Sequence, residues 1–217
     1  MKSNRSIERC LLLFQKFRVN TCPTVSELAR LTELPRATVM RFLLTLEGEG
    51  YVRREHERWR LTAKVLEIGF AALESANISE LVQSSISTLA DQFAGTANIG
   101  ERFEDRVIII ARAVARSDIR HFLVENLRVG STLAQDSALC RALSIEAPRQ
   151  YTSRLYEHAN QLSLAVPMPS VRGRALSLGI ATSRNGLATE QQQLDAVAIL
   201  KSEASRIGRI IDLDPIS

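Results

Sequence analysis

LPRATVMRFLLTLEGE, residues 34–49, decides the fold, because its apolar residues recur with the period of a helix. Four of them fall at i, i+3, i+4 and i+7 and so share one face. These four are Val39, Phe42, Leu43 and Leu46. Pro35 suits the first helical position, and the glycines after Glu47 provide the stop. The stretch therefore predicts one amphipathic helix with a buried stripe.

The opposite face of this helix is unusual for a surface helix. In place of Glu and Lys pairs it presents arginines, threonines and small or apolar groups. Arginine pairs with guanine, threonine with bases or phosphates, and a methyl-bearing side chain with the thymine methyl group. We therefore interpret it as a recognition helix for double-stranded DNA. Its candidate contact residues are Arg36, Thr38, Met40, Arg41, Leu44 and Thr45.

Two further helices are predicted before the recognition helix. The first covers residues 6–17, with Ser6 as its expected N-cap. The second begins at Thr24, which forms a capping box with Glu27. A short loop then leads into the recognition helix, as a helix-turn-helix requires.

Residues 51–62 predict a wing. Two apolar runs flank a charged tip, which is the pattern of a two-stranded hairpin. Arginines on such a hairpin contact phosphate and add affinity without sequence information. Arg54 and Arg58, on either side of the tip, complete the candidate DNA contacts.

Five segments in the first third of the chain resemble a known family. They are SIERCL from Ser6, SELAR from Ser26, LPRATVMRFLLTLE from Leu34, GYVRR from Gly50 and WRLTAKVLEIG from Trp59. Their order and spacing resemble the N-terminal domain of IclR-type bacterial transcriptional regulators. The block LTAKVLEIGF also resembles the branch that controls aromatic-acid breakdown, such as protocatechuate and hydroxybenzoate regulators. The resemblance implies a homodimer or dimer of dimers that binds an operator, expected to be an inverted repeat, and controls a catabolic operon.

The bulk properties agree with a two-part, soluble, cytoplasmic protein. Residues 1–74 hold 13 Lys and Arg against 9 Asp and Glu, whereas the remaining residues hold 15 of each sign. The excess positive charge therefore lies on the expected DNA-binding part. Three scattered cysteines favour reduced thiols over a disulfide framework or a zinc site. No apolar run reaches the length of a membrane span, so no membrane partner is expected.

The predicted organisation has three parts in an α+β fold. Residues 1–62 form the winged helix-turn-helix, residues 63–76 a linker helix, and residues 77–217 an α/β effector-binding and dimerisation domain. By resemblance, this last domain has a twisted antiparallel sheet with helices on one face and a pocket on the other. The elements expected in it are a helix from 77 to 93, strands at 97–103 and 106–113, an apolar run at 119–124, a helix near 136–145, strands at 161–166 and 175–182, and a last helix from Thr189.

The resemblance also implies a ligand site. The family holds a small carboxylated metabolite by backbone amides at a helix start and by side chains on two strands. The matching segments here are ALCRAL at 138–143, SLAVP at 163–167 and ALSLG at 175–179. Cys140 replaces a glycine, so it either narrows the pocket or contributes a thiol. The candidate effector-binding residues are Cys140, Arg141, Ser163, Ser177 and Gly179. Serines that alternate with apolar residues on a strand also commonly face solvent, so a plain surface position stays open for both.

The segment between Tyr151 and Asn160 is much shorter than in the family. By resemblance, the missing part covers the pocket and supplies an acidic residue to it, for which Glu157 is the remaining candidate. The sensor is then open, rebuilt by a partner chain, or lost.

Three classes of function are compared. A ligand-responsive regulator fits the motifs best, and a DNA-binding protein whose second domain only dimerises is the alternative. An enzyme fits poorly, because His56, His121 and His158 are isolated from any residue that would complete a catalytic triad or a metal site. We therefore expect no catalytic residue, no metal and no cofactor.

Overall fold

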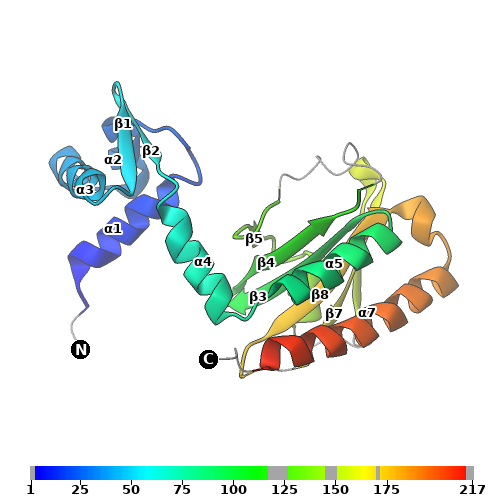
Figure 1. Ribbon diagram of the computed structural model, residues 1–217. Helices are drawn as coiled ribbons and strands as arrows, with labels where there is room; N and C mark the ends of the chain where they lie inside the picture. The colour runs from blue at the N-terminus through cyan, green and yellow to red at the C-terminus, as the bar shows by residue number, and fades with distance from the viewer. Residues whose placement is uncertain (1–2, 117–126, 145–150, 170–171, 214–217) are drawn as a thin grey trace. The chain divides into compact units, whose positions relative to one another are not determined.

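The structure is a computed structural model that describes residues 3–116, 127–144, 151–169 and 172–213. The chain forms two compact units, Met1–Ala72 and Leu73–Ser217 (Figure 1). Each unit has its own buried hydrophobic core.

The N-terminal unit is a winged helix-turn-helix, as predicted. Its elements are α1 (Arg5–Lys16), α2 (Val25–Thr32), α3 (Arg36–Gly48), β1 (Val52–Glu55) and β2 (Arg58–Leu61). The two strands pair antiparallel and form the wing. The capping box of α2 is present, with the Thr24 N–H donating to Glu27 Oε2 at 2.7 Å. One detail differs: the N-cap of α1 is Asn4, whose Oδ1 accepts from the Ser6 N–H at 3.0 Å, so α1 starts before Ser6.

The core of this unit lies between the three helices and the wing. The apolar stripe of α3 supplies Val39 and Leu43, both fully buried, and Leu46. Trp59 of β2 is 1% exposed and closes the core from the wing side. Burial of this stripe leaves the other face of α3 outward, which is the orientation that the candidate contacts require.

The helix α4 (Val65–Ser75) contains no buried residue. Leu66, Ile68 and Phe70 are each about 60% exposed. Apolar side chains gathered on one exposed helix are the mark of an interaction surface.

The C-terminal unit is built on a six-stranded antiparallel sheet, which confirms the predicted fold class. The strand order is β5-β4-β3-β8-β7-β6. The strands are β3 (Thr96–Phe103), β4 (Arg106–Val114), β5 (Thr132–Leu133), β6 (Thr152–Tyr156), β7 (Gln161–Pro167) and β8 (Leu176–Ser183). The helices are α5 (Glu80–Gln92), α6 (Ala138–Ala142) and α7 (Glu190–Asp212), with the 3₁₀ turns η1 (Glu157–Ala159) and η2 (Arg184–Leu187).

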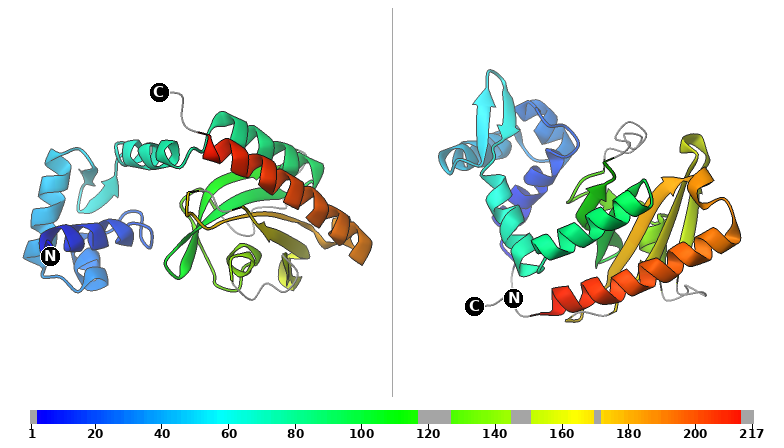
Figure 2. Two further views of the ribbon diagram at one scale, coloured as in Figure 1. Left: turned by 90° about the horizontal axis from the view of Figure 1, so that it is seen from below. Right: turned by 45° about the vertical axis from the view of Figure 1, so that its right-hand side comes forward.

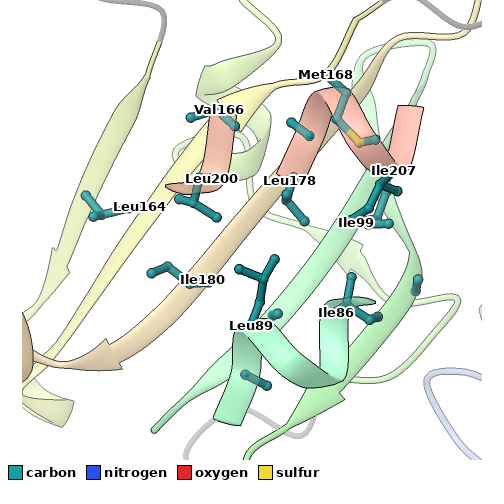
Figure 3. Close-up of a cluster of buried hydrophobic side chains, with 14 of the residues drawn as sticks. Ile86, Leu89, Ile99, Leu164, Val166, Met168, Leu178, Ile180, Leu200 and Ile207 are labelled. Atoms are coloured by element: carbon teal, nitrogen blue, oxygen red, sulfur yellow. The ribbon is translucent and has the colours of Figure 1, made fainter. Parts of the chain in front are cut away.

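The two long helices cover one face of the sheet, and α6 lies against the other (Figures 1 and 2). Alternate residues of each strand point to opposite faces. On β8, Leu176, Leu178 and Ile180 therefore meet the long helices in the main core. The central part of this core is drawn in Figure 3, where Ile86 and Leu89 of α5 and Leu200 and Ile207 of α7 lie over the sheet. The intervening residues of β8 face α6, which is the side on which the predicted effector-binding residues Ser177 and Gly179 lie.

Several boundaries in this unit differ from the sequence predictions. The strand β6 was not predicted, and it joins β7 through η1 in a tight hairpin. The helix expected near 136–145 is only five residues long in α6, and the helix expected from residue 77 begins at Glu80 after the N-cap Ser79. The apolar run at 119–124, with His121, lies outside the described residues.

Candidate DNA interface and ligand site

The outward face of α3 carries all six predicted recognition residues. Arg36, Arg41, Leu44 and Thr45 are exposed, and Thr38 and Met40 are half-buried. Leu44 is 54% exposed, so its methyl groups are available on this face. The Thr45 hydroxyl donates to the Arg41 carbonyl at 3.0 Å and keeps its lone pairs as acceptors.

A surface groove of about 440 Å³ runs between the start of α2, the start of α3 and the wing. Arg36 and Met40 line it from α3, and Arg54 lines it from β1. Three of the predicted DNA contacts are thus brought to one groove by two elements that are separate in sequence. Arg58 is not among the lining residues.

Arg58 instead ties the wing to the segment before α2. Its Nη1 donates to the Cys22 carbonyl at 2.8 Å and lies 3.5 Å from Glu27 Oε2. Arg54 Nε donates to the His56 carbonyl at 2.7 Å, which fixes the turn at the wing tip. Both side chains are exposed, so both still present positive charge at the surface.

The other two wing arginines share one carboxylate. Arg53 and Arg60 lie 2.7 and 2.6 Å from the oxygens of Glu55. The hydrogen bond from Arg60 is the largest cause that holds the pKa of Glu55 below its usual value. An exposed pair of this kind contributes little to stability, but it orders the hairpin surface.

The C-terminal unit contains a cavity of about 60 Å³ on the α6 side of the sheet. Two of the five predicted effector-binding residues, Ser163 and Gly179, line it. The start of α6 also contributes to the lining, at Ser137, Ala138 and Leu139. The predicted strands and helix start therefore do meet at one site.

The other three predicted effector-binding residues do not line this cavity. Cys140 lines a separate surface depression, and Arg141 Nη1 donates to the Ser153 carbonyl at 3.2 Å. Ser177 is fully buried beside Gly100, its partner on β3. Within the described part of the chain, its hydroxyl is the one buried side-chain oxygen or nitrogen without a hydrogen-bond partner.

Several polar residues that line the cavity were not predicted from the sequence. Arg112 of β4 lines it, and its Nη1 donates to Asn98 Oδ1 of β3 at 2.7 Å. Thr96, Tyr156 and Gln161 are further polar lining residues. The signal was present in the sequence, since Arg112 interrupts an apolar strand that ought to be buried on both faces.

Replacing Ser177 with alanine is expected to leave the thermal stability of the protein unchanged or to raise it. A buried hydroxyl without a partner costs about 1–3 kcal/mol of desolvation, which alanine removes. The measurement is thermal unfolding followed by circular dichroism, with Ser163→Ala as the comparison because Ser163 is only half-buried. A clear fall in the unfolding temperature of Ser177→Ala would show that its hydroxyl makes a stabilising contact.

The remaining candidate groups are scattered. Glu157 begins η1, is exposed and does not line the cavity. His56 lies at the wing tip. His158 lies beside Tyr156, and the centroids of these two rings are 6.3 Å apart. Burial raises the pKa of the Cys10 thiol, which favours its protonated, unreactive form. Among the described residues, no three His, Cys, Asp or Glu side chains are grouped as a metal site would need.

No helix among the described residues combines the length and the apolar character needed to cross a membrane.

The chain is similar in sequence and in fold to known transcriptional regulators. The IclR helix-turn-helix domain model matches residues 6–56. The Pca regulon regulatory protein of Pseudomonas putida is 28% identical over 155 residues, which are 69% of this chain and 52% of that protein. The alignment thus spans about half the length of this relative.

Two solved structures share the fold. An IclR family transcriptional regulator from Brucella abortus aligns with a TM-score of 0.78 at 19% identity, over 96% of this chain and 93% of that one. An IclR homolog from Microbacterium hydrocarbonoxydans, complexed with 4-hydroxybenzoate, aligns with a TM-score of 0.73 at 17% identity, over 95% and 98%. These named relatives are regulators rather than enzymes, in agreement with the expectation from the isolated histidines. The chain therefore carries an IclR-type helix-turn-helix domain at residues 6–56, and over its length it is similar in sequence and fold to IclR-type regulators.

Proposed function

We propose that this chain regulates transcription of a catabolic operon by binding an inverted-repeat operator, and that a small carboxylate bound in its second unit changes that binding. The observation that carries the proposal is the outward face of α3, where two exposed arginines stand beside exposed Leu44 and Thr45. Charged, hydroxyl and methyl groups on one helix suit the mixed donor, acceptor and methyl pattern of the major groove.

The groove beside α3 supports a division of labour in DNA binding. Arg41 and Leu44 lie on the outward face of the helix, which suits base edges, whereas Arg54 lines the groove beside α3 from the wing. Contacts from a wing go mainly to phosphate and sugar. We expect α3 to select the sequence and the wing to add affinity.

Replacing Arg54 with alanine is expected to weaken binding to every DNA sequence alike and to lower the salt slope by about one unit, because one phosphate contact is lost. The measurement is fluorescence anisotropy of labelled duplexes across a salt series. Arg58→Ala is the comparison, since Arg58 also braces the wing through the Cys22 carbonyl. A slope that stays unchanged in the Arg54→Ala/Arg58→Ala double variant would place the wing off the DNA.

The helix α4 supports a homodimer. Its apolar side chains are exposed in the single chain, and a second copy of the same helix would cover them symmetrically. A two-fold dimer places two recognition helices on two half-sites, which is why an inverted repeat is expected.

A carboxylate effector is supported by the cavity and by the relatives. One solved neighbour is complexed with 4-hydroxybenzoate, and one curated relative regulates the pca genes. The cavity itself has about 60 Å³, whereas an engineered apolar cavity that holds benzene has about 150 Å³. An aromatic acid would therefore need the site to widen, and a shorter acid would not.

The small size of the cavity also favours a second candidate function, in which the C-terminal unit only dimerises. Titration of the full chain with aromatic and short carboxylic acids separates the two, with DNA affinity and unfolding temperature as readouts. Sensing predicts that one acid raises the unfolding temperature and changes DNA affinity. DNA binding that no acid alters would support the dimerising role, and failure to bind any duplex above non-specific affinity would contradict both.

A further inference from the structure

We infer that Lys64 is a positioning residue for DNA recognition. Together with Thr62 it fastens the start of α4 to the turn that ends the recognition helix α3, and it thereby sets the distance between half-sites that the dimer accepts. Its role concerns the spacing of the operator rather than its base sequence. The inference rests on the proposed dimer through α4 and on the proposed inverted repeat.

The turn after α3 is a Schellman motif centred on Gly50. Gly50 has a φ of +78°, a conformation that favours glycine. Its N–H donates to the Glu47 carbonyl at 2.9 Å, and the Tyr51 N–H donates to the Leu46 carbonyl at 2.8 Å. These bonds satisfy two of the carbonyls that a helix leaves open at its end. The next three carbonyls, of residues 49–51, are bound by groups from further along the chain.

Residues 62–64, just before α4, supply those groups. Thr62 donates twice, its N–H to the Tyr51 carbonyl at 2.9 Å and its Oγ1 to the Gly50 carbonyl at 2.6 Å. Lys64 Nζ donates to the Glu49 carbonyl at 2.9 Å. The Lys64 N–H in turn donates to Thr62 Oγ1 at 3.2 Å, which links the two residues. The start of α4 is therefore bound to the end of α3 at three consecutive carbonyls.

The side chain of Lys64 has two further contacts that fix its direction. Its Nζ lies 5.0 Å from the centroid of the Tyr51 ring, and its stem passes Gly50, where a Cβ would meet Lys64 Cδ at 3.6 Å. An ammonium group is favourable both over an aromatic ring and at the C-terminus of a helix. The Tyr51 ring also meets Phe14 of α1 edge-on, with centroids 6.3 Å apart. The joint between α3 and α4 therefore also reaches α1.

The fold of the N-terminal unit does not depend on Lys64. Its side chain is exposed and lies outside the buried core formed by the three helices and the wing. Loss of its ammonium group should therefore leave the unit folded and change only how firmly the start of α4 is held. This separates a positioning role from a general contribution to stability.

In a dimer through α4, the path from one recognition helix to the other passes through this joint twice. Each base pair added between the half-sites moves the second one by about 3.4 Å and turns it by about 34–36°. Hydrogen bonds are directional, so a joint held by three of them resists a rotation of this size. A joint without them would adapt. The bonds at residues 49–51 therefore predict one preferred spacing.

The test is fluorescence anisotropy of the full chain with duplexes that carry the selected inverted repeat. The spacing between half-sites is varied in steps of one base pair, to two base pairs on either side. The spacing ratio is the affinity at the preferred spacing divided by the affinity two base pairs away. We expect a ratio of at least about 10 for the wild type, because a misplaced half-site loses base contacts that are each worth about this factor.

Lys64→Met is the first variant, because methionine keeps an unbranched stem but has no ammonium group. We expect its spacing ratio to fall by about 3- to 10-fold, since a hydrogen bond and a cation–π contact are lost. The lost positive charge weakens binding to all spacings alike, so it cancels in the ratio. Lys64→Arg should keep the ratio, because a guanidinium also donates and stacks on a ring. Lys16→Met, in the last turn of α1, is the matched control and should keep it as well.

Thr62→Val is the second variant. Valine keeps the shape of threonine and removes the donor to the Gly50 carbonyl, so we expect the ratio to fall in it too. Thermal unfolding followed by Trp59 fluorescence shows whether the N-terminal unit of each variant is folded. Ratios within about 2-fold of wild type in the folded variants would overturn the positioning role, even if affinity falls equally at all spacings.

The remaining outcomes are also decisive. If Lys64→Met and Thr62→Val both fail to fold, their bonds hold the unit together rather than set its spacing, and the inference is overturned. Equal binding of the wild type at every spacing would overturn the inference and leave DNA recognition by α3 standing. If the wild type binds no inverted repeat at any spacing, the proposed operator is overturned together with the inference.

Discussion

Replacing Trp59 with alanine is expected to destabilise the N-terminal unit strongly, to lower its unfolding temperature and to weaken DNA binding. Trp59 is 1% exposed, and its side chain packs into the core that the wing shares with the three helices. Its backbone N–H donates to the Pro23 carbonyl at 2.9 Å, a bond that alanine would keep, so the expected loss comes from the side chain. Truncation of a buried tryptophan costs about 3–5 kcal/mol. A unit of this size has a total stability of about 4–11 kcal/mol, so the loss ranges from about a quarter of this stability to all of it.

Thermal unfolding and DNA anisotropy measure this effect together. Trp59 is the single tryptophan of the chain, so in the wild type its fluorescence reports on the N-terminal unit alone. Trp59→Phe is the control and should retain a folded wing and most of the DNA affinity. A Trp59→Ala protein that unfolds at the wild-type temperature would contradict the wing-to-helix core described above.

Replacing Arg41 with alanine is expected to cost about 1–3 kcal/mol on the preferred operator and to relax the choice at one base pair. The reason is its position: Arg41 is exposed in the middle of the outward face of α3, one turn from the exposed Leu44 and Thr45. The fold should be unaffected, because the buried stripe of the helix is untouched.

The specificity of the loss is the informative part of this experiment. Binding of wild type and Arg41→Ala is compared on the selected site and on single base-pair variants of it. Arg30→Ala, on the last turn of α2, is the control for removal of one positive charge. Equal affinity of Arg41→Ala and wild type for the selected site would mean that α3 does not read the DNA at that position.

The fold of the N-terminal unit was predictable because its signals are local. The apolar stripe of α3 and the capping box at Thr24 each depend on residues only a few positions apart. The structure buries Val39, Leu43 and Leu46 as the period requires, and it leaves the opposite face outward.

The sheet of the C-terminal unit was predictable in its central strands and not at its edge. The apolar runs that became β4 and β8 are the mark of buried strands. The edge strand β6 has a mixed and partly exposed sequence, TSRLY, which gives no alternation to detect. Its pairing with β7 is fixed by the neighbouring strand rather than by its own residues.

At the predicted ligand site, the sequence predicts on which face of the sheet a residue lies but not whether that residue reaches the cavity. The period of a strand gives the face on which Ser177 and Gly179 lie, and both do face α6. It does not say what covers each residue, and here Ser177 is sealed beside Gly100 while Gly179 reaches the cavity. The pairing of Arg112 with Asn98 depends on the register between two strands, which no local pattern specifies.

The most direct test of the central claim is selection of bound duplexes from a random DNA pool by the full chain. We predict enrichment of an inverted repeat whose half-sites are about one helical turn apart, or a multiple of this, as two α3 helices of a two-fold dimer require. Selection repeated with Arg41→Ala should then relax one base pair in each half-site. A pool that shows no enriched sequence, or an enriched motif that Arg41→Ala leaves unaltered, would contradict recognition of DNA by α3.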